Sequence, residues 1–278
     1  MSSMPEFDDM DAATLRRLLH LVREYTGIAI VEGKKTMLQT RLRPRMRGLN
    51  LGSYSDYVQH LSEDDSERQA FIDAVTTHQT RFFRTPKVWQ YMREILLPTW
   101  TQRHKNRPFR VWSAAASTGE EVCSIAICCE EMRRQKPDFS YEIIGTDIST
   151  YVLEQARLGE YTGTSISAFR ATYPVLFDRY NAAGFADRFT LTAPLRSRIT
   201  FSPHNLLSKS PWRDDFDAVF LRNVLIYFNA DDIRRIVCNI APSMREHGEL
   251  IIGESESLTS MDVPFQFVQP LVYERRSG

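Results

Sequence analysis

The chain has 278 residues, and its 35 basic and 35 acidic side chains give a formal net charge of +0. Hydrophobic residues make up 42% of it and charged residues 25%, which is typical of a soluble globular protein with one large or two modest domains. The balanced charge disfavours a general nucleic-acid-binding protein, which would show a basic excess. The sequence also lacks the apolar segment of a signal peptide and the roughly 20 apolar residues of a membrane helix. We therefore expect a cytoplasmic protein with no membrane insertion and no stable nucleic-acid partner.

Four helical patterns occupy the first 80 residues, at 11–25, 36–48, 53–61 and 65–76. The first follows Asp11, a residue type suited to an N-cap, and repeats leucine and valine at helical spacing. Pro44 conflicts with the second pattern, because proline removes a hydrogen bond from a helix interior and kinks it. The sequence predicts an all-helical N-terminal domain over residues 1–80.

Strand and helix patterns alternate from residue 109 onward. The strand patterns are FRVWSA (109–114), YEIIGTD (141–147), FDAVFLRN (216–223) and GELIIGE (248–254), and the helical patterns lie at 119–134, 149–159 and 231–244. This alternation predicts an α/β domain with a parallel sheet covered by helices on both faces, over residues 81–278. Residues 265–276 predict a final edge strand, and residues 78–100 join the two parts.

Residues 160–202 break this alternation. They are rich in threonine, serine and aromatic residues, and they contain two short strand patterns, FTLTAP (189–194) and RITFSP (198–203). We interpret the segment as an insertion with a small β element.

The four cysteines are Cys123, Cys128, Cys129 and Cys238. Their spacing matches no zinc-binding pattern, and two of them stand in the apolar run SIAICC. Free cysteine in such a run behaves as a small hydrophobic residue. We expect the thiols of Cys128 and Cys129 to pack in the core, and we expect no metal site.

The ends of the first two strands favour a nucleoside site. The first strand runs into SAAASTGEE (113–121), where small residues allow a ligand to approach the backbone. Gly119 is the single glycine there, so the pyrophosphate-binding fingerprint is missing and a smaller nucleoside fits better. Asp147 ends the second strand, where a carboxylate accepts hydrogen bonds from ribose hydroxyls, although it competes with Ser149 to cap the next helix.

The third strand ends in LRNVLIYF (221–228). Arg222, Asn223 and Tyr227 are polar groups inside this apolar run, and burying them without partners would be costly. We expect them to meet a ligand or one another. The sequence has no Asn/Asp-Pro-Pro-aromatic segment, which points away from methylation of nitrogen.

Six segments together resemble the chemotaxis receptor methyltransferases, the CheR family, in order and over nearly the whole chain. They are THQTRFFR (77–84), WSAAASTGEEVCSIA (112–126), GTDIS (145–149), NLL (205–207), FDAVFLRNVLIYF (216–228) and GESES (253–257). The resemblance implies a Rossmann-like S-adenosylmethionine-dependent methyltransferase domain with a β subdomain inserted at about 160–202, after an N-terminal helical domain. The implied reaction methylates glutamate side chains of chemotaxis receptors for sensory adaptation and releases S-adenosylhomocysteine.

The resemblance also implies which residues contact the cofactor. They are His78, Thr80, Arg84, Glu121, Asp147, Asn205, Leu206, Arg222 and Asn223. The family motif Asn-x-Thr-x-Phe-Phe-Arg begins here with His78 in place of asparagine. Histidine differs in shape and titrates near neutral pH, so this contact stays open.

The chemistry of the implied reaction suggests two catalytic side chains. A glutamate acceptor has a pKa near 4.3 and is already a carboxylate at pH 7, so the enzyme must align the reactants and exclude water. We assign Arg84 to positioning the acceptor carboxylate. The same guanidinium would also contact the carboxylate of the cofactor. Tyr227 would orient the acceptor through its hydroxyl; the alternative is a half-buried aromatic residue on the sheet.

A run of basic residues with no acidic residue among them lies in the second predicted helix. Its members are Lys34, Lys35, Arg41, Arg43, Arg45 and Arg47. Such a run is either a solvated helix face or a docking surface for an acidic partner. The resemblance favours docking of the cytoplasmic receptor helices. In some relatives the β subdomain also binds a receptor C-terminal peptide by strand addition, and the sequence leaves open whether this protein does so.

Three other functions are alternatives to this one. An RNA methyltransferase would use the basic helix to bind phosphates, and a non-catalytic module would bind the cofactor as a signal. A dehydrogenase is disfavoured by the missing glycine fingerprint. The identity of the receptor, the modified glutamates, the output pathway and the oligomeric state stay open.

Overall fold

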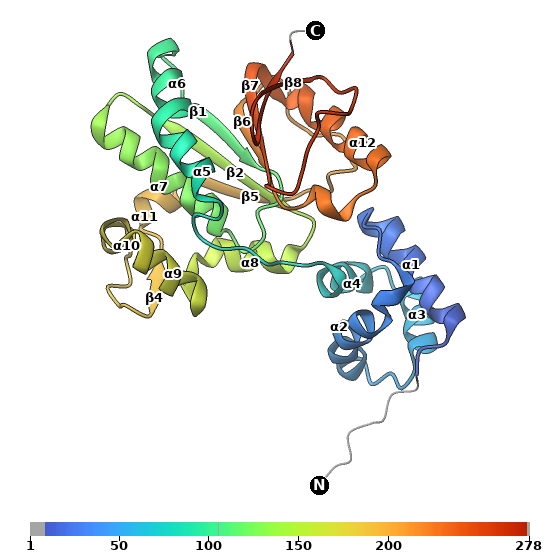
Figure 1. Cartoon of the computed structure of the whole chain (residues 1–278). Helices are drawn as coiled ribbons and strands as arrows, with labels where there is room; N and C mark the ends of the chain where they lie inside the picture. The colour runs from blue at the N-terminus through green and yellow to red at the C-terminus, as the bar shows by residue number, and fades with distance from the viewer. Residues whose placement is uncertain (1–8, 105, 277–278) are drawn as a thin grey trace.

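The computed structural model describes residues 9–104 and 106–276 (Figure 1). The N-terminal stretch, in which the sequence predicts no leader, is described only from residue 9 onward. The first part of the chain consists of helices α1 (Ala12–Thr26), η1 (Glu32–Lys34), α2 (Lys35–Gly48), α3 (Tyr54–Glu63) and α4 (Glu67–Val75). The prediction of an all-helical N-terminal domain is confirmed.

Helix α2 continues through Pro44, so the helix predicted over 36–48 forms in spite of this proline. Leu38, Leu42 and Met46 are fully buried along one face of the helix, while Pro44 is exposed. Tertiary packing of an apolar face contributes most of a helix's stability in a protein and outweighs one missing hydrogen bond.

The second part contains three layers and an insertion. Its sheet strands are β1 (Phe109–Ser113), β2 (Tyr141–Asp147), β5 (Ile199–Pro203), β6 (Phe216–Leu221), β7 (Met244–Ile252), β8 (Phe265–Gln269) and β9 (Val272–Arg275). Its helices are α5 (Pro86–Tyr91), η2 (Met92–Leu96), α6 (Leu97–Arg103), α7 (Glu120–Gln135), α8 (Thr150–Leu158), η3 (Leu225–Tyr227), α12 (Ala230–Ile240) and η4 (Ala241–Ser243). The insertion consists of β3 (Glu160–Thr162), α9 (Thr164–Thr172), α10 (Pro174–Tyr180), β4 (Arg188–Thr190) and α11 (Ala193–Arg196).

The seven-stranded sheet has the order β5-β2-β1-β6-β7-β9-β8. Strands β5, β2, β1, β6 and β7 are parallel, while β9 and β8 run antiparallel at one edge. The predicted Rossmann-like α/β fold is confirmed. The single edge strand expected over 265–276 is instead a hairpin, because the chain turns at Pro270 and at Leu271, whose φ is +74°.

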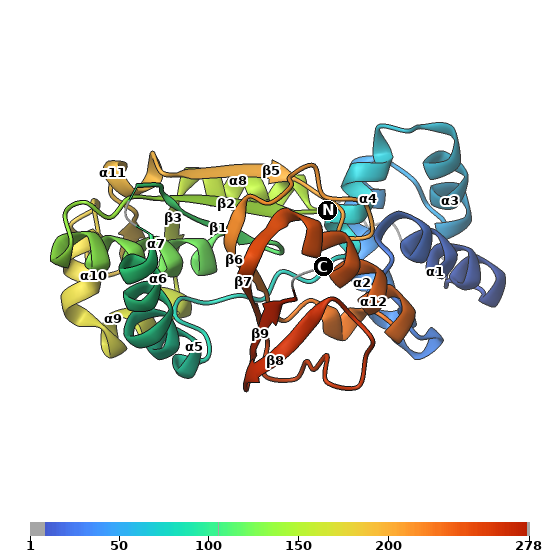
Figure 2. The same cartoon turned by 90° about the horizontal axis from the view of Figure 1, so that it is seen from above.

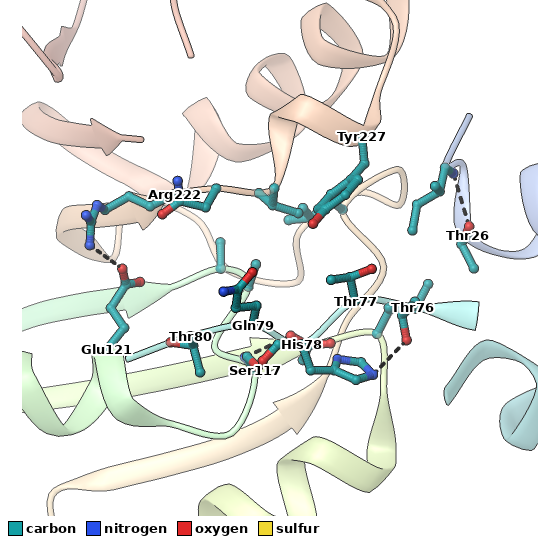
Figure 3. A pocket seen from close by; sticks show the side chains of 18 of the residues that line it. Thr26, Thr76, Thr77, His78, Gln79, Thr80, Ser117, Glu121, Arg222 and Tyr227 are labelled. Carbon is teal, nitrogen blue, oxygen red and sulfur yellow. Dashed lines mark hydrogen bonds and ion pairs between the residues drawn. The ribbon is translucent and has the colours of Figure 1, made fainter. Parts of the chain in front are cut away.

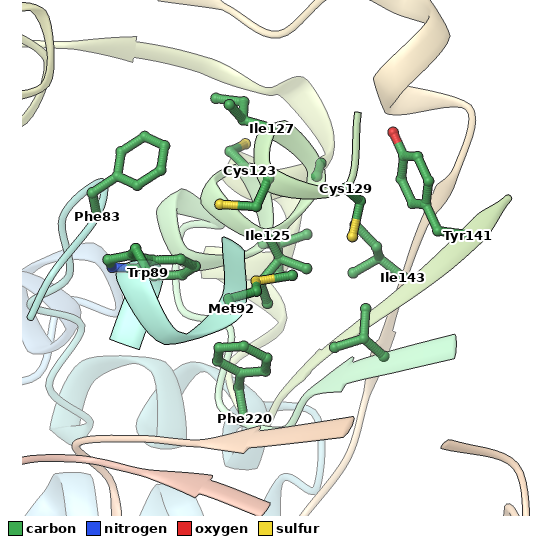
Figure 4. Close-up of a cluster of buried hydrophobic side chains, with 14 of the residues drawn as sticks. Phe83, Trp89, Met92, Cys123, Ile125, Ile127, Cys129, Tyr141, Ile143 and Phe220 are labelled. Carbon is green, nitrogen blue, oxygen red and sulfur yellow. The ribbon is translucent and has the colours of Figure 1, made fainter. Parts of the chain in front are cut away.

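Two separate cores cover the faces of this sheet. On one face, the core contains side chains of helices α5, η2, α6 and α7 and of strands β1, β2 and β6 (Figure 4). Trp89, Phe109 and Ile125 are among them. On the other face, Trp112 and Ile236 belong to a core that includes α12. Burial on both faces explains why every residue of β6 is buried, as expected for a central parallel strand.

Three of the cysteines belong to the first core. Cys123, Cys128 and Cys129 are buried on α7 and carry free thiols, whereas Cys238 is exposed. Burial raises the pKa of Cys123 and that of Cys128 to about 12. These thiols are therefore protonated near neutral pH and act as packing groups.

The insertion differs from the prediction in one strand. Residues 198–203 were expected to belong to it, but β5 pairs in parallel with β2 and forms the edge of the main sheet. The sheet of the insertion is the antiparallel pair β3–β4. Side-chain packing explains why β5 lies beside β2. Gly145 of β2 leaves space for the Phe201 ring of β5, because a Cβ on Gly145 would come within 2.6 Å of that ring.

The N-terminal helices and the insertion lie at opposite ends of the molecule (Figure 2). The end of α1 and the segment after it contact the loops at the carboxyl ends of the strands. The Ala29 N–H donates to the Tyr227 carbonyl at 3.0 Å, and the Asn205 amide donates to the Tyr25 carbonyl at 3.2 Å. An ion pair between Arg23 and Asp232 joins α1 to α12. These contacts hold the N-terminal domain against one end of the sheet.

Arg45 neutralises a buried carboxylate in the N-terminal domain. The Glu67 side chain is 1% exposed and accepts hydrogen bonds from Arg45 Nε at 2.8 Å and from Tyr57 Oη at 2.8 Å. Arg43 on the same helix is exposed and donates to Tyr54 Oη at 3.2 Å, an uncharged partner. Arg45 therefore has a structural role that Arg43 lacks.

We predict that Arg45→Ala lowers the free energy of unfolding by about 2 kcal/mol, because it leaves the Glu67 carboxylate buried without its cation. Urea unfolding followed by circular dichroism measures this change. Arg43→Ala is the matched control and should change the free energy of unfolding by less than about 0.5 kcal/mol. Equal effects of the two substitutions would contradict the assignment.

Candidate active site

A pocket of about 900 Å³, counting its open mouth, lies at the carboxyl ends of β1, β2 and β6 (Figure 3). This is where ligands bind in open parallel sheets, at the point where the strand order reverses. Thr26 and Ile28 from the N-terminal domain line one side of it. The structure brings together around this pocket all ten side chains predicted for the cofactor and the catalytic roles, namely His78, Thr80, Arg84, Glu121, Asp147, Asn205, Leu206, Arg222, Asn223 and Tyr227.

Asp147 joins the loops that follow β1 and β2. Its carboxylate accepts hydrogen bonds from the backbone N–H groups of Ser117 at 2.9 Å and Ser149 at 3.0 Å. Ser149 caps helix α8 by accepting from Val152 N–H, so the competition for that cap is resolved against Asp147. Desolvation by burial raises the pKa of Asp147. The remaining lone pairs of this carboxylate are available to a pair of hydroxyl groups.

Gly119 serves helix packing at the first strand end. Its φ is +94°, and a Cβ there would lie 2.8 Å from Tyr161 Oη and 3.0 Å from the Cβ of Ala156 on α8. Ala114 and Ala115, just before it, line the pocket. Glycine is therefore needed for the contact of α7 with its neighbours, and the small residues before it leave room for a ligand.

Glu121 and Arg222 form a buried ion pair beside the pocket. Arg222 Nη1 lies 2.8 Å from Glu121 Oε2, and the two side chains are 1% and 13% exposed. The other oxygen of Glu121 accepts from Ser113 Oγ at 2.9 Å. Arg222 Nη2 donates to the Arg84 carbonyl at 2.8 Å, and the guanidinium lies over the Trp89 ring. The pair thus ties the ends of β1 and β6 to the segment that carries Arg84.

The segment 77–84 enters the pocket between two anchors. The rings of Phe82 and Phe83 are buried; Phe82 stacks on Phe169 of the insertion, and Phe83 packs against the same ring at an interplanar angle of 44°. The Arg84 carbonyl accepts from Trp89 Nε1 at 2.8 Å as well as from Arg222. The backbone is therefore held while the Arg84 guanidinium, which donates to the Gln79 carbonyl at 3.2 Å, stays at the pocket surface.

His78 points along the edge of the pocket. Its Nε2 lies 3.0 Å from Thr76 Oγ1 and 3.3 Å from the Asp73 carbonyl, so the ring is bonded to the end of α4 (Figure 3). Its carbonyl accepts from Ser117 Oγ at 2.9 Å, which links this segment to the loop after β1.

Apolar and uncharged groups line the side of the pocket near β5. Ile148 and Leu206 are two of them. The Asn205 amide is engaged within the protein, since its Oδ1 accepts from Leu207 N–H at 3.0 Å and its Nδ2 donates to the Tyr25 carbonyl. Desolvation lowers the pKa of His204, which therefore lines the pocket as a neutral ring near pH 7. This region suits a flat, uncharged heterocycle.

Some residues that build the site were missed by sequence reasoning. Thr26 and Ile28 come from another domain, and no spacing in the sequence relates them to the strand ends. Glu256, in the segment GESES, accepts hydrogen bonds from the backbone N–H groups of Asn223, Val224, Leu225 and Gly253. This segment is part of the family resemblance, but the role of Glu256 depends on a contact between two loops.

Comparison with known families decides the class of the protein. Residues 78–273 match the family described as "CheR methyltransferase, SAM binding domain", and residues 13–76 match "CheR methyltransferase, all-alpha domain". The chain belongs to the CheR methyltransferase family. The suspected resemblance is confirmed, and S-adenosylmethionine is the cofactor of its larger domain.

Similar curated proteins span the whole chain. A chemotaxis protein methyltransferase 2 of Pseudomonas aeruginosa is 34% identical over 275 residues, which covers 97% of this chain and 96% of that protein. The chemotaxis protein methyltransferase of Salmonella typhimurium is 34% identical and covers 94% of this chain and 89% of its own. That of Escherichia coli is 32% identical, with coverage of 94% and 90%. This CheR-family chain is therefore a methyltransferase of the chemotaxis type.

We predict that affinity for S-adenosylhomocysteine falls on acidification. The fall should begin at a higher pH than it would if Asp147 had the pKa of an ordinary aspartate. Burial raises the pKa of Asp147, so on acidification this carboxyl takes up its proton at a higher pH than an ordinary aspartate does and then loses acceptor capacity. The sign for stability is opposite, because a raised carboxyl pKa makes the folded protein bind the proton more tightly, and the contribution of this group to stability grows as pH falls.

Calorimetric titration between pH 7.5 and pH 5 measures the affinity. Asp147→Asn should bind more weakly at pH 7.5, by roughly tenfold, and should lose this part of the pH dependence. An unchanged pH profile in the variant would contradict the role of Asp147.

Proposed function

We propose that this methyltransferase esterifies glutamate side-chain carboxylates of chemotaxis receptors, with S-adenosylmethionine as donor. The observation that carries the proposal is the convergence of Arg84, Asp147, the Glu121–Arg222 pair and Tyr227 on one pocket of a CheR-family chain. The curated relatives are named chemotaxis protein methyltransferases, which supports a receptor of that pathway as the acceptor.

Each part of the cofactor would contact pocket residues of matching chemistry. Asp147 would accept hydrogen bonds from the ribose hydroxyls, and Ile148 and Leu206 would contact the adenine. The Glu121 carboxylate would attract the amino group, and the Arg84 guanidinium would bind the carboxylate of the methionine part. Thr80, Asn205 and Asn223, with His78 at the edge, complete the proposed contacts.

The proposed mechanism relies on alignment. When bound, S-adenosylmethionine supplies a methyl group on a positively charged sulfur. The acceptor carboxylate is ionised at pH 7 and needs no base to remove a proton. Arg84 and the Tyr227 hydroxyl hold and orient that carboxylate by donating hydrogen bonds to it. Thr26 and Ile28 of the N-terminal domain reduce the access of water to the reacting atoms.

For receptor docking we propose the exposed cations at the end of η1 and along α2. Lys34, Arg43 and Arg47 are exposed, and an acidic receptor helix would be attracted to them. Arg45 contributes less, because it is paired with the buried Glu67. Lys35 also contributes less, because it forms an ion pair with Asp9 at 2.8 Å.

Arg41 belongs to the basic run and also forms hydrogen bonds to residues 75–77. Its guanidinium donates to the carbonyls of Val75 and Thr76 and, at 2.8 Å, to Thr77 Oγ1. Thr76 and Thr77 line the cofactor pocket. Arg41 thus connects the proposed docking helix to the pocket.

We place the reaction in the cytoplasm, where the receptor helices with their glutamates would be reached. No helix in the described part of the chain is long and apolar enough to cross a bilayer. A receptor C-terminal peptide, if this receptor has one, would add a strand to β3–β4 of the insertion. An RNA acceptor and a purely sensory role are the alternatives, and a receptor methylation assay distinguishes both from the proposed function.

We predict that Arg84→Ala abolishes methylation of receptors while the protein stays folded, because the guanidinium sits at the pocket surface and only the Arg84 carbonyl supports the fold. Purified protein is incubated with labelled S-adenosylmethionine and receptor-bearing membranes, and base-labile methyl esters are measured. Arg170→Ala, which removes an exposed arginine of α9, is the control and should turn over normally. Normal turnover of Arg84→Ala would refute the assignment. Cofactor binding by the unaltered protein without label on any receptor would favour another acceptor or a sensing role.

We predict that replacing Lys34 and Arg43 together by glutamate lowers kcat/KM for receptors roughly tenfold at low salt, because it reverses the attraction for acidic helices. The difference from the unaltered protein should shrink as ionic strength rises above the physiological value. Affinity for S-adenosylhomocysteine, measured in parallel, should not change. Salt-independent kcat/KM values would count against docking through α2.

A further inference from the structure

One carboxylate, that of Glu256, joins the loops that follow β6 and β7. Its Oε1 accepts from the backbone N–H groups of Val224 at 2.9 Å and Leu225 at 2.8 Å. Its Oε2 accepts from Asn223 N–H at 3.1 Å and Gly253 N–H at 2.5 Å. Four backbone donors therefore converge on one side chain, which is about the acceptor capacity of an ionised carboxylate.

The backbone around this carboxylate is shaped for close approach. Asn223 has a φ of +59°, a left-handed conformation that few residue types other than glycine and asparagine adopt readily. A Cβ on Gly253 would lie 2.7 Å from Glu256 Oε2 and 2.9 Å from the Asn223 nitrogen. Glycine is therefore required at 253 for the two loops to come together on the carboxylate.

The turn held by Glu256 carries two residues of the pocket. Helix η3 (Leu225–Tyr227) has no side-chain cap from its own N-cap residue, Val224. Glu256 supplies the missing acceptor from a distant part of the chain. Asn223 lies just before this turn and Tyr227 at its end, and both line the pocket.

We propose that Glu256 is a positioning residue for methyl transfer, which holds the turn Asn223–Tyr227 so that the Asn223 amide and the Tyr227 hydroxyl face the pocket. This inference rests on the proposed function, because it uses the acceptor-orienting role of Tyr227. The inference also explains why residue 256 is a glutamate and not a glutamine. A glutamine would offer one oxygen, and its NH₂ group would face two of the four N–H donors.

The experiment compares Glu256→Gln, Tyr227→Phe and the double variant of the full chain. Receptor methylation and the affinity for S-adenosylhomocysteine are both measured. Glu256→Gln should lower kcat roughly 10- to 100-fold in the unaltered background but only about 3-fold or less in the Tyr227→Phe background, since two residues that act as a unit are not additive. It should also weaken S-adenosylhomocysteine binding, because Asn223 moves. Glu254→Gln, an exposed carboxylate of the same loop, is the matched control and should behave as the unaltered protein.

Two results would overturn the inference. One is unchanged turnover and S-adenosylhomocysteine affinity in Glu256→Gln. The other is the same fold-loss in both backgrounds, which would assign Glu256 to general stability. Where Glu256→Gln fails to fold, Gly253→Ala is used in its place, since it pushes the loops apart and leaves the carboxylate present. An unaltered protein inactive on receptors would refute the proposed function, while the affinity measurement would still test Glu256.

Discussion

The buried ion pair between Arg222 and Glu121 is the contact on which the rest of the site depends. It joins the end of β6 to the first turn of α7, and through the Arg84 carbonyl it reaches the segment that leads in from the N-terminal domain. Removing one partner of such a pair leaves an uncompensated charge in the interior, at a cost of about 3–5 kcal/mol. The site therefore needs both residues even before any cofactor binds.

The pocket combines groups from two domains, which distinguishes it from a simple nucleoside site at strand ends. The strand ends supply Asp147 and the Glu121–Arg222 pair, while the N-terminal domain supplies Thr26 and Ile28. Gly27 between these two has a φ of +75°, and a Cβ there would come within 2.1 Å of Leu207. The close approach of the two domains thus depends on a residue without a side chain.

Much of the fold and of the site was predictable from the sequence because the relevant signals are local. The alternation of strands and helices determines the parallel sheet, and in such a sheet the ends of successive strands meet at one edge, so Asp147 and Arg222 were expected near one another. The error at 198–203 has the opposite origin, since a six-residue strand pattern does not specify its partner strand. Phe201 pairs β5 with β2 because Gly145 leaves space for its ring. Glu256, Thr26 and Ile28 could not be placed for the same reason, because their roles arise from contacts between distant segments.

The shared pocket makes the cofactor and the domain contact thermodynamically linked. Any ligand that touches both Ile28 and Asp147 binds the docked arrangement more tightly than an undocked one, and reciprocity then requires that it strengthen the docking by the same factor. Substitutions at Arg23, Gly27 or Asp232, which contact no ligand, would therefore appear in a binding experiment as altered cofactor affinity. The two domains of this chain, although each has its own hydrophobic core, would respond to the cofactor as one cooperative unit.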